Sequence, residues 1–202
     1  MKIVLATSNQ GKIKEFKELM PQDEVCAFEE IVGKMEIEET GVTFQENAIL
    51  KAKTVYDKLN DEHAIVISDD SGISVPVLHN EPGVYSARYA GINANDKANN
   101  AKLMTKLKEA NLTSTPAFYT ACIAMVYQGQ IYTVHGWMHG EVIDHERGTN
   151  GFGYDPMFIP HGYTKTLGEL EKEIKKIFSH RSQALYLAQK VLEVLTKKPN
   201  SF

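Results

Sequence analysis

The chain has 202 residues, of which 43% are hydrophobic and 24% charged, a composition typical of a globular protein large enough for a well-buried core. Its 22 Lys and Arg residues against 26 Asp and Glu residues give a formal net charge of −4, so no overall positive field favours nucleic acid, and an anionic ligand is expected to be small. The apolar run at residues 1–6 is too short for a signal peptide, and no stretch approaches the ~20 apolar residues of a membrane span, which predicts a cytoplasmic protein without membrane contact.

The first predicted element is a buried strand over residues 2–6, followed by a polar loop and a helix that begins near Lys12. The loop, Thr7-Ser8-Asn9-Gln10-Gly11-Lys12, brings small hydroxyl groups, one lysine and free backbone N–H groups to a helix N-terminus, an arrangement that binds phosphate and other anions. It lacks the glycine spacing of a Walker A motif. The alternative interpretation is a simple helix cap with a solvated lysine.

A second helix is predicted to begin at Thr43-Phe44-Gln45-Glu46, which matches a capping box. Apolar residues recur at helical spacing from Phe44 to Leu59, while Asn47 and Lys51 lie four residues apart on another face. An acidic pair, Glu38-Glu39, stands just ahead of this helix.

A second acidic pair follows a predicted central strand. The apolar run Ala64–Ile67 ends in Ser68-Asp69-Asp70-Ser71-Gly72, and ligand crevices form at the carboxyl ends of such strands. Adjacent carboxylates repel each other, so their placement requires a cation, hydrogen-bond donors or a solvated turn. One carboxylate from each pair could hold a hard cation with oxygen ligands, as Mg²⁺ prefers. The alternative is a common Asp-Ser-Gly turn.

The remaining predicted elements are a helix, a hairpin, a short strand and two more helices. Their approximate ranges are 96–111 for the helix, 117–127 and 131–137 for the hairpin, 142–143 for the strand, and 166–178 and 181–195 for the last helices. This order predicts an α/β fold with a mixed sheet, not the strict alternation of a doubly wound fold. We expect one domain over residues 1–202, with room for two lobes around a cleft.

Two later segments carry candidate ligand contacts. The stretch Gly148–Pro156 holds three glycines around Phe152 and Tyr154, so its backbone can approach a ligand closely and an aromatic ring can stack on it. The alternative is a turn whose aromatic rings fill the core. A basic stretch between the last two helices suits recognition of phosphate and of a purine edge, unless its charges are merely solvated. Its members are Lys172, Lys175, Lys176, His180 and Arg181.

Together these segments resemble the inosine triphosphate pyrophosphatase family, also called the non-canonical purine NTP pyrophosphatases. Six blocks occur in the family's order and span nearly the whole chain. They are residues 7–12, 38–48, 68–72, 82–91, 151–156 and 179–181. Each block is modest alone, but six in sequence are highly specific.

The resemblance implies an elongated α/β subunit with a mixed sheet, flanking helices and a central active-site cleft, working as a homodimer. It implies Mg²⁺-dependent hydrolysis of ITP, dITP or XTP to the monophosphate and pyrophosphate. Asp70 is implied as the catalytic carboxylate, and Glu39 and Asp70 as metal ligands. The implied triphosphate contacts are Thr7, Ser8, Asn9, Gln10, Gly11, Lys12, Lys51 and Lys175. The implied nucleoside contacts are Ser71, Phe152, Gly153, Tyr154, Asp155, His180 and Arg181, with Phe152 against the base.

Some points stay open at this level. The sequence does not decide whether Lys175 or its neighbour Lys176 reaches phosphate, and it assigns no role to His135 or His139. A related pyrophosphatase for other modified nucleotides is one alternative function. A catalytically silent nucleotide-binding protein is another, and the presence of both acidic pairs together with the lysines argues against it.

Overall fold

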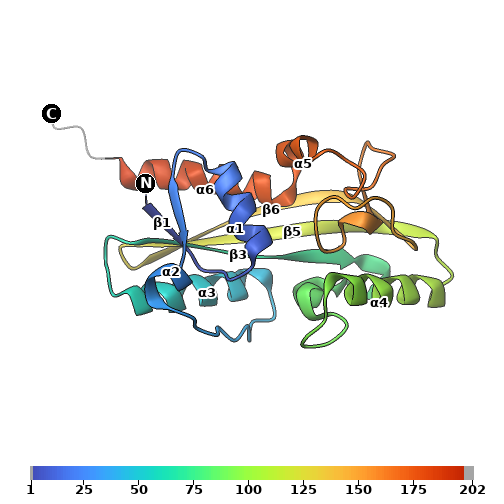
Figure 1. The fold of residues 1–202 in the computed structure, drawn as a ribbon, viewed down its shortest axis with the longest axis horizontal. Coiled ribbons are helices and arrows are strands. Elements are labelled where there is room, and N and C mark those ends of the chain that lie inside the picture. Colours follow the sequence, from blue (N-terminus) through green and yellow to red (C-terminus); the bar gives the residue numbers. More distant parts are fainter. Residues whose placement is uncertain (1, 198–202) are drawn as a thin grey trace.

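The computed structural model describes residues 2–197 and contains a seven-stranded mixed sheet with helices on both faces (Figure 1). The strands are β1 (Lys2–Leu5), β2 (Glu24–Ala27), β3 (Ile65–Val75), β4 (Glu81–Pro82), β5 (Ser114–Tyr127), β6 (Gln130–Ile143) and β7 (Phe158–Pro160). The α-helices are α1 (Gln10–Leu19), α2 (Glu29–Val32), α3 (Phe44–Leu59), α4 (Asp96–Glu109), α5 (Lys172–Phe178) and α6 (His180–Thr196). Short 3-10 helices are η1 (Pro76–Leu78), η2 (Gly83–Arg88) and η3 (Asp155–Met157). Among these residues, no helix combines the length and the hydropathy that a bilayer span requires.

The strand order in the sheet is β2-β1-β3-β5-β6-β7, with β4 paired to β3. β1 runs parallel to β2 and β3, and all other pairs are antiparallel. The predicted α/β fold with a mixed sheet is therefore confirmed. β5 and β6 form the predicted hairpin, and they pair over their whole length, so the residues predicted as a separate strand at 142–143 are the end of β6.

The period-2 alternation of β3 distributes its side chains between two cores in one half of the molecule. Ile67 packs with Phe16 and Ala184 under α1 and α6, whereas Val66 packs with Ala48 under α3. Figure 1 shows these helices on opposite sides of the sheet. A third core lies in the other half, where α4 and the segments after β6 cover the far ends of the same long strands. Its buried members include Ile73, Leu103, Leu107, Tyr119, Met138 and Phe158.

Two predicted boundaries are wrong. β3 does not end at Ile67, because its ladder with β5 continues without a break from Val66 to Ser74. The Asp-Ser-Gly turn is thereby excluded, and both aspartates lie inside a strand. Only half of the second capping box forms: the Thr166 N–H donates to Glu169 Oε2 at 2.8 Å, whereas the Glu169 N–H donates to the Thr166 carbonyl oxygen and not to its hydroxyl group. This motif closes one turn, and α5 begins later, at Lys172.

Candidate active site

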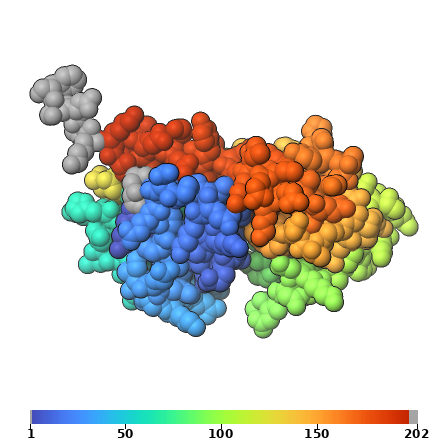
Figure 2. Space-filling model, turned by 45° about the horizontal axis from the view of Figure 1, so that its top comes forward, coloured from blue at the N-terminus to red at the C-terminus, as the bar shows by residue number. Residues whose placement is uncertain are grey.

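The site lies at an interruption in one edge of the sheet. β1 accompanies β3 only as far as Ile67, and β4 joins that edge again at Ser74. Residues 68–73 therefore pair with β5 on one side and, among the residues described, have no strand on the other. A cavity of about 360 Å³ opens here, and Figure 2 shows the surface indented between the blue N-terminal segments and the green part of the chain.

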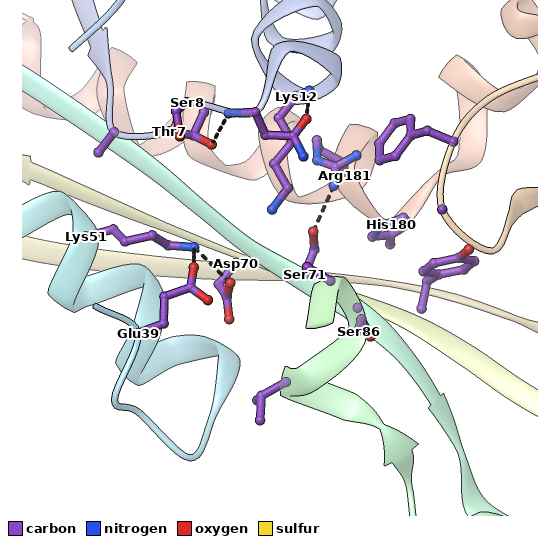
Figure 3. A pocket seen from close by; sticks show the side chains of 18 of the residues that line it. Thr7, Ser8, Lys12, Glu39, Lys51, Asp70, Ser71, Ser86, His180 and Arg181 are labelled. Carbon is purple, nitrogen blue, oxygen red and sulfur yellow. Dashed lines mark hydrogen bonds and ion pairs between the residues drawn. The ribbon is translucent and has the colours of Figure 1, made fainter. Parts of the chain in front are cut away.

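Neighbouring aspartates on this stretch face opposite sides of the sheet, because side chains alternate along a strand. Asp69 points toward α1 and α6, where Lys12 Nζ lies 2.6 Å from Oδ2 and the Arg181 guanidinium lies at 3.4 Å. Asp70 points toward α3, where Lys51 Nζ lies 2.8 Å from Oδ1. Of the two, only Asp70 lines the cavity (Figure 3).

The two carboxylates differ in the direction of their pKa shifts as well as in the direction they face. Burial alone would raise the pKa of Asp69, but Arg181 and Lys12 outweigh it and hold that pKa well below its ordinary value. Burial raises the pKa of Asp70, and Lys51 only partly opposes this. Asp69 is thus a fixed anion that anchors two cations, whereas Asp70 is the carboxylate suited to take a proton from a molecule in the cavity.

Glu39 reaches the cavity from the extended segment between α2 and α3. Its Oε1 accepts from Lys51 Nζ at 2.7 Å and its Oε2 accepts from Arg88 Nη1 at 3.0 Å. Burial alone would raise the pKa of Glu39, but Lys51 and Arg88 outweigh it and the pKa is lowered. The Glu39 and Asp70 carboxylates therefore lie on either side of one ammonium group (Figure 3).

A buried amide holds this pair in place. Asn47 is fully buried, its Nδ2 donates to Asp70 Oδ2 at 3.4 Å, and its Oδ1 accepts from the Gly41 N–H at 2.8 Å. Gly41 lies two residues after Glu39, so one side chain connects the Asp70 carboxylate to the segment that carries Glu39. The capping box places Asn47 here, because Thr43 Oγ1 accepts from the Glu46 N–H and fixes the first turn of α3.

The donor set at this point fits a hard divalent cation bound through few protein ligands. Within the described residues, no three His, Cys, Asp or Glu side chains gather as a complete metal cage. Glu39 and Asp70 nevertheless turn carboxylate oxygens toward the same point, 2.7 and 2.8 Å from Lys51 Nζ. Mg²⁺ is commonly held by one or two carboxylates together with substrate phosphates and waters, which matches this pair.

The predicted anion loop leads from β1 into α1 at one side of the cavity. Asn9 caps the helix, with its Oδ1 accepting from the Lys12 N–H at 3.1 Å, and Thr7 Oγ1 accepts from the Asn9 N–H at 3.2 Å. Thr7, Ser8, Asn9 and Lys12 line the cavity, whereas Gln10 and Gly11 are exposed and do not line it. Lys12 also donates to the Asp69 carbonyl oxygen, which is accessible because no strand pairs with it on that edge.

The glycine-rich loop and the start of α6 form the other side of the cavity. The Phe152 N–H and Lys175 Nζ both donate to Asp155 Oδ2, at 3.0 and 2.6 Å. Lys175 Nζ also lies 4.9 Å from the centre of the Phe152 ring. Lys175 is therefore the lysine that faces the cavity, at its aromatic end. Lys176 pairs with Glu18 at 2.8 Å instead.

His180 and Arg181 begin α6 and are both buried. Burial and the nearby Arg181 lower the pKa of His180 well below its ordinary value, so its ring is neutral and stacks on Tyr119 at 4.7 Å. Arg181 donates to Ser71 Oγ at 2.8 Å and to Glu15 Oε2 at 2.5 Å. Its guanidinium is therefore fixed by protein contacts on the cavity wall.

Two contributors to the site, Glu15 and Arg88, escape the sequence patterns. Glu15 accepts a hydrogen bond from Arg181, which lies 166 residues later in the sequence, and no local pattern predicts such a contact. Arg88 lies in the block at 82–91, but nothing there indicates its pairing with Glu39. Asn47 did have a signal, because it stands four residues before Lys51 and therefore on the same face of the helix.

Comparison with known proteins identifies the family of the chain. Residues 3–191 match the Ham1 family. The chain is 67% identical over 198 residues to the dITP/XTP pyrophosphatase of Aliarcobacter butzleri, covering 96% of this chain and 100% of that protein. It is 55% identical over 202 residues to the dITP/XTP pyrophosphatase of a Sulfurovum species, covering 98% and 96%.

Solved structures give the same answer for the fold. The Ham1 protein of Staphylococcus aureus aligns with a TM-score of 0.85 at 42% identity, covering 97% of this chain and all of that one. A HAM1 protein from Coxiella burnetii aligns with a TM-score of 0.86 at 36% identity, covering 96% and 98%. Sequence and structure agree over nearly the whole length, and the chain belongs to the Ham1 family.

Proposed function

We propose that the protein hydrolyses the non-canonical purine nucleoside triphosphates ITP, dITP and XTP to the nucleoside monophosphate and pyrophosphate, with residues 1–202 acting as one catalytic domain. Relatives named dITP/XTP pyrophosphatase, aligned over nearly their whole length, support this. The structural observation that carries it is the position of Asp70. This carboxylate lines the cavity between a lysine-bearing anion loop on one side and an aromatic loop on the other.

In this proposal the triphosphate lies along residues 7–12 and Lys51, and the purine lies against Phe152. Lys12 and Lys51 both approach the Asp69 carbonyl, at 3.3 and 3.0 Å, so their ammonium groups converge on the phosphate side of Asp70. We reassign Lys175 from the phosphate contacts to the nucleoside end, because it pairs with Asp155 beside the Phe152 ring.

Asp70 acts as the general base. A water molecule in the cavity gives its proton to the Asp70 carboxylate while its oxygen attacks phosphorus, the α–β anhydride bond breaks, and pyrophosphate departs. Lys12 and Lys51 balance the negative charge that builds up on the phosphate oxygens. The raised pKa of Asp70 suits this role, because a base whose pKa lies nearer the working pH transfers protons more effectively.

Glu39 and Asp70 are the residues that would hold a divalent cation, which we infer to be Mg²⁺. The cation, when bound, neutralises charge on the triphosphate and polarises its phosphoryl groups. Arg88 and Asn47 orient the two carboxylates from behind, through the oxygens that do not face Lys51.

Base choice belongs to the end of the cavity where Arg181, His180 and the 152–155 loop meet. The guanidinium of Arg181 offers only donors, so beside a purine it favours a 6-keto oxygen over the 6-amino group of adenine. Ser71 and Glu15 hold it in one orientation before substrate arrives. A fixed donor that faces another donor is costly, which is how a polar site discriminates strongly.

The decisive experiment is a pyrophosphate-release screen over ITP, XTP, ATP, GTP and a pyrimidine triphosphate, with Mg²⁺ and with excess EDTA. We expect release from ITP and XTP in Mg²⁺ and none in EDTA. Binding of ITP without release would favour the silent binding protein, and preferential release from the pyrimidine would favour the related pyrophosphatase. Full turnover in EDTA would contradict the metal requirement.

We also infer that the protein is a cytoplasmic homodimer that acts on free nucleotides and not on nucleic acid. The family resemblance is the basis for the dimer. A groove lined by the exposed apolar side chains of Trp137, Ile177 and Tyr186 provides surface that a second subunit could cover. Light scattering of the purified protein at micromolar concentration tests this, and a monomer mass would contradict it.

A further inference from the structure

Lys51 sits inside a cage of oxygen atoms. Its Nζ donates to Glu39 Oε1 at 2.7 Å and to Asp70 Oδ1 at 2.8 Å (Figure 3). It also donates to the Asp69 carbonyl oxygen at 3.0 Å. The side chain is buried, with 7% of the residue exposed. Carboxylate and carbonyl oxygens are the ligands that hard divalent cations take. The ammonium group thus occupies the point toward which the implied metal ligands converge.

The cage is held from outside, independently of Lys51. Glu39 receives Arg88 on its other oxygen at 3.0 Å, and Asp70 receives Asn47 on its other oxygen at 3.4 Å. The Asp69 carbonyl belongs to the β3 backbone, which its ladder with β5 fixes. These three oxygens therefore stay directed at the same point when the lysine side chain leaves it.

Charge is balanced in this arrangement. Two carboxylates, Glu39 and Asp70, face two cations, Lys51 and Arg88. Burial alone would lower the pKa of Lys51, but Asp70 and Glu39 outweigh it, so the group remains a cation. A divalent cation entering the cage would meet this ammonium at contact distance, and the repulsion between like charges is strong at a buried site.

We propose that Lys51 occupies the position of the divalent cation in the nucleotide-free protein, so that the cation is accepted only together with a triphosphate. The triphosphate supplies the anionic oxygens to which the Lys51 ammonium transfers, and the three cage oxygens then become free for the metal. This rests on the proposed function. It assigns Lys51 two successive partners, the carboxylate cage and then the phosphates, and it sets the order in which the site assembles.

The test is a titration of the nucleotide-free protein with Mn²⁺ at a pH where both carboxylates are ionised. The EPR signal of free Mn²⁺ reports how much of the metal is bound. Lys51→Met should bind Mn²⁺ about tenfold more tightly than the wild type, or better, because removal of a competing charge at contact distance changes affinity by at least that order. Lys51→Gln, whose amide still donates to the carboxylates, carries the same comparison if the Met variant is not recovered folded.

Lys12→Met is the matched control. It removes the same charge from the same cavity, but Lys12 bonds the Asp69 side chain at 2.6 Å and, of the three cage oxygens, only the Asp69 carbonyl, at 3.3 Å. The two carboxylate oxygens of the cage keep their contacts in this variant. We expect a clearly smaller gain in Mn²⁺ affinity. A gain as large as that of Lys51→Met would show a general charge effect and overturn the proposal, as would equal Mn²⁺ affinities of the wild type and both Lys51 variants.

The Mn²⁺ affinity of the wild type, measured with and without nucleotide, tests the proposal a second way. Mn²⁺ should bind the unaltered protein weakly alone and tightly in the presence of the uncleavable α,β-methylene analogue of ITP, more tightly than the analogue itself binds Mn²⁺. Tight binding to the nucleotide-free wild type would overturn the proposal. Failure of the proposed function is distinct from this outcome, because it would appear as absence of pyrophosphate release, which the Mn²⁺ titrations do not involve.

Discussion

At the scale of single residues, Asp69 and Asp70 show how one step along a strand separates two roles. The strand directs one carboxylate to a buried pair of cations and the other to the cavity. The sequence identified the acidic pair, and the family resemblance implied Asp70 as the catalytic member. Neither could explain why Asp70 and not Asp69 faces the cavity. That reason lies in the extension of β3 past Ile67, which only its pairing with β5 determines.

Asp70→Asn is expected to lower kcat by about 10²–10⁴-fold, the usual loss when a general base is removed. The substitution is nearly isosteric, so the fold and the KM for ITP should change little. Steady-state kinetics of pyrophosphate release with ITP measure both constants. Retention of most of the turnover would show that another group takes the proton.

Asp69→Asn should affect stability instead. Removing this charge leaves Lys12 and Arg181 without their shared buried partner, a change that costs about 3–5 kcal/mol in comparable buried pairs. The folded-state pKa of Asp69 is depressed, so its contribution is present above its ordinary value of 3.8 and is lost as the pH falls below that value. Urea unfolding at pH 7 and at a series of pH values below 3.8 tests this: the wild type should lose its advantage over the variant progressively on acidification. An equal gap at every pH would contradict it.

The candidate site was predicted where ligand chemistry shows in local sequence, at residues 7–12, 38–39, 69–70 and 151–156. What could not be predicted is which partners the site residues take. The pairing of Lys175 with Asp155 depends on how α5 packs beside a loop 20 residues away, and no local spacing encodes that.

At the scale of elements, long and strongly periodic segments were predictable and most short ones were not, although the short strand β1 was predicted from its continuous apolar run. α3 follows from its capping box and helical spacing, and the β5–β6 hairpin from two strand-like segments that flank a glycine-containing loop. β2, β4 and β7 have four, two and three residues, too few for a hydrophobic period to be recognised, and they form because a neighbouring strand offers its hydrogen bonds. The motif at Thr166 shows the converse error: half of its capping box forms and one turn closes, but no helix follows directly.

Gly136 on β6 allows α6 to approach the sheet closely. A Cβ at this position would collide with the backbone oxygen of His180 and lie 2.7 Å from the Ala184 nitrogen. Gly136→Ala should therefore displace the start of α6, lower the melting temperature and raise the KM for ITP by moving His180 and Arg181. Calorimetry and steady-state kinetics measure these changes. Unchanged values for both would show that the helix is not held at this contact.

At the scale of the whole molecule, the site draws on segments from every third of the chain. The anion loop and the acidic segment belong to one half, the aromatic loop to the other, and β3 joins them. A ligand that contacts both halves should stabilise the entire fold. Binding to the native state alone adds about 2.7 kcal/mol at a ligand concentration of 100 Kd.

We therefore expect the α,β-methylene analogue of ITP together with Mg²⁺ to raise the melting temperature, whereas Mg²⁺ alone should raise it little. Differential scanning fluorimetry at several analogue concentrations checks this. The matching ATP analogue serves as the control for base choice and should give a smaller shift at equal concentration. Equal shifts for the two analogues would place selectivity in the chemical step and not in binding.

The β5–β6 hairpin has a mechanical consequence. Its two 14-residue strands are bonded to each other along their full length and extend under both halves of the protein. Sliding one half past the other would break many of these bonds together, whereas bending or twisting the ribbon breaks none. The hairpin therefore allows the two halves to bend toward each other, which narrows the cavity, and it resists sliding of one half along the other. The ease with which the walls come together then depends on the stiffness of the whole ribbon, and not only on the residues that line the cavity.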